Sequence, residues 1–321
     1  ADFGQYTTIG SFWDQAAAPA MPRPVLDEQE KGAPGLAEST APAAALWRQP
    51  ERRMPARGLV GRVDIPGTVS HFVARGAYVY LPPAALVPHP VRLPVMIMLS
   101  GQPGGPDDVV KAGALAAIMD ARAKAHHGLA PIVVVPDQLG DPDSNPMCVD
   151  STRLGNVETY LTVDVPRWIR THLAVQPSPA AWAIGGFSEG GTCSIQLGAG
   201  HPGLFTAIFD VSGQVAPVKG SLQNTVLVGF DGDAARYRAA APENLLIAHT
   251  PYHDAVAVFG SGEDDARYGP GVDRIAAAAR AAGIRVTRAV APGTAHDWHT
   301  VQWLMANAFD PIAQHLGVQA P

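Results

Sequence analysis

The stretch AIGGFSEGGTCS, residues 183–194, decides how this chain is interpreted. It places Ser188 between Gly186 and Gly190, directly after a short apolar run. A G-x-S-x-G sequence at a strand-to-helix junction is typical of a serine nucleophile on a strained turn, where small residues let strand and helix pass closely. The alternative is an ordinary glycine-rich turn. The first interpretation requires a base, an acid and oxyanion donors elsewhere in the chain, in a workable order.

Buried strands and helices alternate on both sides of this stretch. Continuous apolar runs such as 93–99 and 130–137 are typical of strands buried on both faces of a parallel sheet. The expected strands are 58–67, 70–83, 93–99, 130–137, 181–187, 205–213, 254–262 and 284–293, the first two as an antiparallel pair. The expected helices are 107–126, 156–173, 190–202, 271–283 and 300–316. This alternation predicts an α/β fold with a mostly parallel central sheet and helices on both faces.

The first part of the chain lacks this periodicity. Residues 1–55 are rich in Ala and Pro, so we predict an arm or linker with short helices that lie against the domain. Its aromatic residues Phe12, Trp13 and Trp47 are the expected anchors. Residues 56–321 then form the α/β domain.

Composition and charge exclude several classes of protein. The net charge is −6, which argues against a nucleic-acid partner because such binding needs Lys and Arg to neutralise phosphates. No apolar stretch is long enough to span a bilayer, and the chain starts at Ala1 without a signal core, which is compatible with removal of a leader or anchor. Without a CxxC pair or a His/Cys cluster, we expect no metal and no organic cofactor. The spacing of Cys148 and Cys193 leaves two buried thiols and a disulfide equally open; a disulfide would imply an oxidising compartment.

A base for Ser188 is offered by the segment APGTAHDWHT, residues 291–300. His296 lies just past the last strand, where a loop can place it over the carboxyl edge of the sheet. His299 is the competitor, but we expect it in the final helix or facing solvent.

The acid is expected after the strand at 254–262, which gives the chain order Ser, acid, His. Three carboxylates stand there side by side, Glu263, Asp264 and Asp265. Their spacing from Gly262 favours Asp265 as the acid, with Glu263 as the second choice. The carboxylates that are not used are expected to form a solvated acidic turn. The chosen carboxylate would orient His296 and stabilise its imidazolium form.

The oxyanion donors are expected to be two backbone amides. One is the amide of Glu189, directly after the nucleophile. The other belongs to the loop SGQPGGP, residues 100–106, that follows the strand at 93–99. Pro103 has no N–H, so Gln102 is the predicted donor.

These residues resemble the esterase D and antigen 85 (mycolyltransferase) branch of the α/β-hydrolases over about residues 60–310. ETYLTVDVPRWI resembles the helix before that family's nucleophile, GFSEGGTCSIQLGAGHPGLFTAIFDVSG its nucleophile turn and next strand, and GTAHDWHTVQW its histidine loop. A group of actinobacterial envelope esterases, often fused behind membrane helices, is more similar still. They share patterns like NPMCVDS, GNVETYLTVDV, GGTC and GxDDxxYGP.

The resemblance implies Ser188 as nucleophile, His296 as base and Asp265 as acid, with oxyanion donors as above. It also implies that Cys148 pairs with Cys193. It further implies an extracytoplasmic domain whose Pro/Ala-rich arm tethers it to a membrane segment. One departure matters: mycolyltransferases carry Asp-Gly-Leu-Arg at the oxyanion loop, where this chain has Ser-Gly-Gln-Pro at 100–103. The missing Arg, which helps to bind the sugar, favours hydrolysis over mycolyl transfer.

The leading hypothesis is therefore a serine esterase that hydrolyses a lipid or cell-envelope ester through an acyl-enzyme, with aminoacyl-phosphatidylglycerol as one specific substrate. The alternative is an acyltransferase, in which Trp298 and Trp303 line an acceptor site; core packing is the favoured role for both. The intact serine, acid and histidine argue against a non-catalytic domain. A dehydrogenase is the least favoured, because no G-x-G-x-x-G sequence stands between a strand and a helix.

Overall fold

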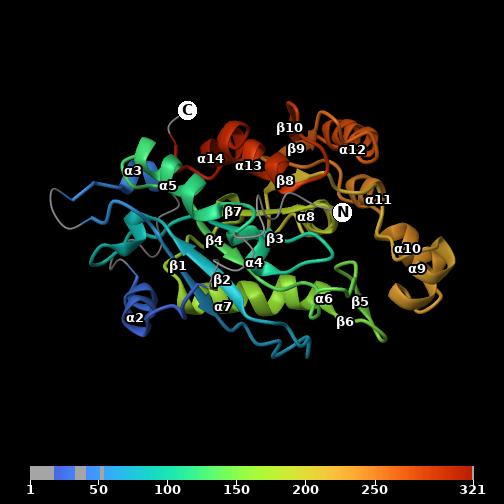
Figure 1. Ribbon diagram of the computed structural model, residues 1–321, viewed down its shortest axis with the longest axis horizontal. Coiled ribbons are helices and arrows are strands. Elements are labelled where there is room, and N and C mark those ends of the chain that lie inside the picture. Colours follow the sequence, from blue (N-terminus) through green and yellow to red (C-terminus); the bar gives the residue numbers. More distant parts are fainter. Residues whose placement is uncertain (1–17, 33–40, 51–53, 320–321) are drawn as a thin grey trace, which may run out of the picture.

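The computed structural model describes residues 18–32, 41–50 and 54–319, and its centre is an eight-stranded sheet (Figure 1). The strands lie in the order β1-β2-β4-β3-β7-β8-β9-β10. Only β1–β2 and β2–β4 pair antiparallel, so the prediction of a mostly parallel sheet is confirmed. The strand bounds are β1 Leu59–Val63, β2 Ala77–Leu81, β3 Val95–Leu99, β4 Ile132–Val135, β7 Trp182–Phe187, β8 Ala207–Val211, β9 Val256–Gly262 and β10 Arg285–Ala291.

Burial along the sheet follows the sequence pattern. Every residue of β3, β4, β7, β8 and β9 is buried, as their unbroken apolar runs predict. At the far edge, β10 is mostly exposed or half-buried and carries Arg285 and Arg288. Charged side chains on an edge strand discourage pairing with another molecule.

Strand order places the helices on both faces. The chain moves from β3 to β4 in one direction along the sheet and from β7 to β8 in the other. Because crossovers between parallel strands are right-handed, α5 (Leu115–Ala125) covers one face and α8 (Glu189–Gly200) the other. The closing helix α13 (Trp298–Asn307) packs on α5, and α12 (Gly269–Ala281) packs on β9 and β10 (Figure 1). A reversal of this kind opens a crevice at the carboxyl ends of the central strands.

Three expected helices differ from the simple prediction. The helix expected over 107–126 is divided into α4 (Pro106–Val110) and α5 by a turn at Gly113. The one expected over 300–316 is divided into α13 and α14 (Asp310–His315), because Pro311 cannot continue a helix. The third, over 156–173, runs through α6 (Val157–Thr159), a π-helical turn η2 (Tyr160–Asp164) and α7 (Val165–His172). Pro166 lacks the N–H that a regular α-helix would use here.

The described part of the N-terminal segment packs on the sheet. It contains α2 (Arg23–Lys31) and α3 (Ala43–Leu46). Met21 N donates a hydrogen bond to Arg62 O, and the buried Trp47 donates its indole N–H to His127 O. The other two expected anchors, Phe12 and Trp13, lie outside the described residues.

Sequence reasoning missed the segment between β8 and β9, residues 213–250, which we call the cap. It forms α9 (Leu222–Gly229), α10 (Ala234–Ala239) and α11 (Pro242–Ala248); α9 and α10 lie at one end of the molecule (Figure 1). A small second core, built on Met147, Val149 and Phe230, joins the cap to the loop after β4. The remaining short elements are η1 Pro83–Leu86, η3 Pro179–Ala181 and the hairpin β5 Asp150–Ser151 with β6 Gly155–Asn156. No helix within the described ranges is long and apolar enough to cross a membrane.

Candidate active site

Ser188 lies on the sharp turn between β7 and α8. Its backbone has φ 58° and ψ −111°, a region that a non-glycine residue rarely adopts and that is typical of serine nucleophiles. The turn is held by the hydrogen bond from Ser188 N to Val211 O, at 2.8 Å. The predicted strand-turn-helix context is therefore present.

Two glycines make this turn sterically feasible. A Cβ atom on Gly186 would lie 2.2 Å from the carbonyl oxygen of Gly190. A Cβ atom on Gly190 would lie 2.4 Å from the carbonyl oxygen of Ser100. Both distances are far inside van der Waals contact, so the first turn of α8 passes β7 and the end of β3 only because both side chains are absent.

His296 and Asp265 meet Ser188 at the carboxyl edge of the sheet. His296 Nε2 lies 2.8 Å from Ser188 Oγ, and His296 Nδ1 lies 3.1 Å from Asp265 Oδ2. The histidine directly precedes Asp297, which caps the N-terminus of α13 by accepting a hydrogen bond from Thr300 N. The ring of Tyr268 flanks the imidazole at a centroid distance of 4.3 Å.

The environment of Asp265 keeps it ionised. Burial pushes its pKa up, but hydrogen bonds to the carboxylate, above all from His296, outweigh burial and leave the pKa below its ordinary value. Its Oδ1 also accepts the backbone N–H of Tyr268. An anionic Asp265 can accept the Nδ1 proton of the imidazole, and in that tautomer the unprotonated Nε2 faces Ser188.

The competing candidates lie elsewhere. Glu263 is exposed and accepts the backbone N–H of Gly293, and Asp264 is exposed beside it. His299 is half exposed on α13, 3.7 Å from Asp297. The structure therefore brings Asp265 and His296 to the serine and leaves these three outside.

The predicted oxyanion donors lie on either side of Ser188. Gln102 and Ser188 line one small cavity of about 20 Å³, together with Gly101, Pro103, Phe187, His296 and Trp298. Over the described ranges, neither the N–H of Gln102 nor that of Glu189 donates to a protein acceptor. The loop is held from outside, because Arg75 donates to Gly104 O and is paired with Asp137. The oxyanion role of these two amides stays a prediction, with which their lack of a protein acceptor is consistent.

The two cysteines form a disulfide, Cys148–Cys193, so the pairing implied by the family resemblance is present. It joins the loop after β4 to the second turn of α8. One carboxyl oxygen of Glu189 lies 3.1 Å from Cys193 Sγ. These three side chains cluster as metal ligands do, but the disulfide removes the thiolates that a metal would need.

Sequence reasoning missed two residues at this edge. Tyr268, which packs on His296, follows Asp265 by three residues and could have been proposed from that spacing. Gln138 is completely buried three residues after the end of β4, and no motif marks it.

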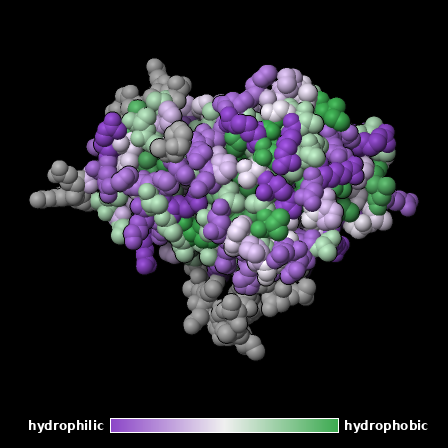
Figure 2. Space-filling model, turned by 90° about the horizontal axis from the view of Figure 1, so that it is seen from above, coloured by the Kyte–Doolittle hydropathy of each residue, from purple (hydrophilic) through white to green (hydrophobic). Residues whose placement is uncertain are grey.

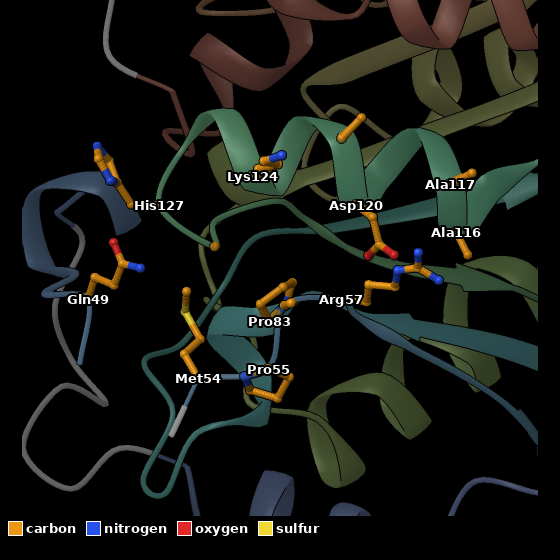
Figure 3. Close-up of a pocket in the computed structure, with 13 residues that line it drawn as sticks. Gln49, Met54, Pro55, Arg57, Pro83, Ala116, Ala117, Asp120, Lys124 and His127 are labelled. Atoms are coloured by element: carbon orange, nitrogen blue, oxygen red, sulfur yellow. The ribbon is translucent and has the colours of Figure 1, made fainter. Parts of the chain in front are cut away.

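A much larger cavity lies apart from this chemistry. Its volume is about 880 Å³, and it lies between Gln49, residues 54–57 and α5. Figure 3 shows Arg57 and Asp120 turned toward one another on opposite walls, with Gln49 and His127 at the other end. Asp120 already accepts hydrogen bonds from Gly58 N and Tyr80 OH, so its role is structural. The cavity shares no lining residue with the one above Ser188.

Comparison with known proteins identifies the family. The family model described as "Putative esterase" matches residues 73–307. The chain belongs to this esterase family. An uncharacterized protein of Corynebacterium glutamicum is 33% identical in sequence. The alignment covers 98% of the esterase described here and 71% of the relative. The resemblance to the esterase D and antigen 85 branch is thereby confirmed, and the protein is a carboxylic ester hydrolase.

Solved structures share the fold of this esterase. An S-formylglutathione hydrolase from Agrobacterium tumefaciens aligns with TM-score 0.66 and 20% identity, covering 82% of the esterase and 97% of that chain. A ferulic acid esterase from Anaeromyces mucronatus, solved with ferulic acid, aligns with TM-score 0.60 and 15% identity over 84% and 95% of the two chains. The α/β-hydrolase fold predicted from the sequence is confirmed.

Proposed function

We propose that the esterase cleaves its substrate through Ser188, His296 and Asp265 by way of an acyl-enzyme. The observation that carries this proposal is the unbroken chain of two contacts, Ser188 Oγ to His296 Nε2 at 2.8 Å and His296 Nδ1 to Asp265 Oδ2 at 3.1 Å. Nucleophile, base and orienting acid at such distances are the geometric signature of covalent serine catalysis.

The reaction follows from these contacts. His296 Nε2 takes the proton of Ser188 as its Oγ attacks the ester carbonyl, and Asp265 stabilises the resulting imidazolium. The backbone amides of Gln102 and Glu189 bind the oxyanion, each worth about 3 kcal/mol of barrier. His296 then returns the proton to the leaving alcohol. A water activated by the same histidine attacks the acyl carbon, releases the acid and regenerates Ser188.

For the substrate we propose an ester with an apolar part, from a lipid or the cell envelope. The cap begins next to the nucleophile turn, where Gln214 N donates to Thr192 Oγ1 on α8. From there it exposes Val215, Val218 and Leu222 to solvent, the last with 62% of its surface accessible. On the face shown in Figure 2, apolar residues form small groups among polar ones. Exposed aliphatic side chains on a segment that starts next to the nucleophile turn favour an alkyl chain over a small polar ester.

We further propose an extracytoplasmic location, with a membrane tether outside the described residues. The support is the disulfide, because such bonds persist in oxidising compartments and are rare in the cytosol.

The test of the proposed function is hydrolysis of p-nitrophenyl esters from acetate to palmitate by the wild type and by Ser188→Ala, without reductant. We expect turnover to disappear in the variant and to favour medium or long chains in the wild type. Vesicles containing aminoacyl-phosphatidylglycerol, assayed for the released amino acid, extend the series to a membrane ester. Equal turnover by Ser188→Ala would refute the mechanism, and a strict preference for acetate would refute the lipid substrate.

Acyl transfer, the alternative, gains little support from the two tryptophans. Trp303 packs on the core, the role that the sequence favoured. Trp298 is buried against Phe187 at a ring distance of 5.1 Å and also lines the small cavity at Ser188, whose volume of about 20 Å³ leaves no room for an acceptor. Adding trehalose or glycerol to the ester assay should yield free acid and no new ester.

A further inference from the structure

A buried side-chain bridge connects the two backbone segments that supply the oxyanion donors. Gln138 is completely buried, and its Nε2 donates to Ser100 O at 2.8 Å and to Glu189 Oε2 at 3.0 Å. Ser100 opens the loop that carries the Gln102 amide, and Glu189 supplies the other amide itself. The two segments are far apart in the sequence and meet at this amide group.

We propose that Gln138 is a positioning residue for the oxyanion hole, holding the Gln102 and Glu189 amides in register through Ser100 and the Glu189 side chain. The proposal rests on the proposed function, because it presumes an oxyanion formed on a Ser188 adduct. A terminal amide has two N–H groups, and here both are used, one for each segment. Replacing Gln138 by an apolar residue would release both segments at once.

Three features make the bridge rigid. The Ser100 carbonyl lies between Gln138 and Gly190, so closely that a Cβ on Gly190 would clash with it. Asp137, the preceding residue, is paired with Arg75 at 2.7 Å and fixes the backbone that carries Gln138. The other carboxyl oxygen of Glu189 lies against the disulfide, which prevents the side chain from turning away.

The surroundings of the Glu189 carboxyl group make Gln138 its main polar contact. No ion pair between Glu189 and a cation occurs within the described ranges, so the Gln138 amide is its strongest polar partner. Burial is costly for a carboxylate and raises the pKa of Glu189 to about 7. An isolated buried carboxyl group with a single amide donor contributes little to stability, which is consistent with retention for a positional role.

The experiment compares Gln138→Leu with Gln29→Leu. Gln29 is an equally buried glutamine on α2 whose Nε2 donates to Ala85 O at 2.7 Å, and it takes no part in the active site. Both variants lose buried hydrogen bonds and should lose stability. Only Gln138→Leu should lower kcat, by about tenfold to a hundredfold, with KM within threefold, because loss of one oxyanion donor lowers kcat by about 10²–10³. Binding of a trifluoromethyl ketone, which forms an oxyanion on Ser188, should weaken in parallel with kcat/KM.

Glu189→Leu breaks the bridge from its other end and leaves the backbone amide in place, so it tests the proposal even where Gln138→Leu folds poorly. The double variant should lose no more kcat than the worse single variant, because the two side chains act as one unit. The inference is overturned by unchanged kcat in Gln138→Leu, by an equal loss in Gln29→Leu, or by additive losses in the double variant. Wild-type turnover by Ser188→Ala would instead overturn the proposed function itself.

Discussion

The carboxyl edge of the sheet that carries Ser188, His296 and Asp265, here called the edge, differs from the cap in burial and packing. At the edge, the carboxyl ends of five neighbouring buried strands lie side by side, and the side chains of Ser188, His296 and Asp265 are joined by consecutive contacts. The cap has short helices and leaves Leu222 and Ile247 exposed, at 62% and 74%. In the mechanism proposed above, the buried edge carries the chemistry, and substrate selection is left to a part that can vary without disturbing it.

The two regions are joined at several points, among them the packing of α11 on α8. The small core around Phe230 packs the cap on Met147 and Val149, which flank Cys148 in the loop after β4. The disulfide fixes that same loop to α8. Hydrogen bonds from Asn145 Nδ2 to Val218 O and from Ser151 Oγ to Val228 O add further links. Substitutions confined to one region therefore test whether the edge and the cap behave independently.

The largest effect is expected at the edge. Asp265→Asn should lower kcat by about 10²–10⁴-fold, because an amide favours the wrong imidazole tautomer and cannot stabilise the imidazolium. The matched control is Glu263→Gln, two residues away, whose carboxylate only accepts a backbone N–H from Gly293. Kinetics on p-nitrophenyl butyrate give both values. A similar loss in the two variants would show that the acidic turn acts through its overall charge.

Removing the disulfide should loosen the cap more than the edge. The two cysteines are separated by 45 residues, and closing a loop of that length stabilises a protein by about 4 kcal/mol in the chain-entropy model. The Cys148→Ala/Cys193→Ala variant should show that loss in urea unfolding. Native-state hydrogen exchange should rise in residues 213–250 and change little in β7. Equal exchange in both regions would contradict the division.

Buried acids at the edge make stability depend on pH. Burial raises the pKa of Asp210 to about 8, far above its unfolded value of 3.8. The folded protein therefore binds this proton more tightly than the unfolded chain does, and stability is lost as pH rises toward 8. Asp210→Asn, which keeps an acceptor for Gly213 N, should remove part of that loss.

Thermal unfolding at pH 5 and pH 8 measures the difference. Over this range, the free energy of unfolding of the wild type should fall by about 1 kcal/mol per pH unit more than that of Asp210→Asn. Asp273→Asn, at an exposed carboxylate on α12, serves as the control and should follow the wild type. Parallel curves for all three proteins would show that Asp210 is ionised in the folded state.

The smallest effect is expected in the cap. Leu222→Ser should raise KM for p-nitrophenyl palmitate about threefold, because burying a leucine side chain contributes about 1.5–3 kcal/mol and only part of it contacts substrate. For the acetate ester neither kcat nor KM should change. The exposed Leu227→Ser, further along α9, is the matched comparison. A loss of kcat on acetate would show that the cap is coupled to the edge.

The sequence predicts the edge well because its signals are local. Continuous apolar runs mark the buried strands, and the order of Ser188, Asp265 and His296 follows from residues that end those strands. The cap has no such signal, since helices of six to eight residues are stabilised by tertiary contacts and not by their own periodicity. Gln138 escapes sequence reasoning for a related reason: a polar residue after a strand is ordinary until the fold places Ser100 and Glu189 against it.

The most direct test of the central claim is to trap the acyl-enzyme. A rapid quench of the esterase with excess p-nitrophenyl ester, followed by peptide mass spectrometry, locates the acyl group. We expect one acyl group per molecule on the peptide containing Ser188, formed in step with a burst of p-nitrophenol and absent from Ser188→Ala. Steady turnover with no acyl group on Ser188, or with the acyl group on another residue, would contradict it.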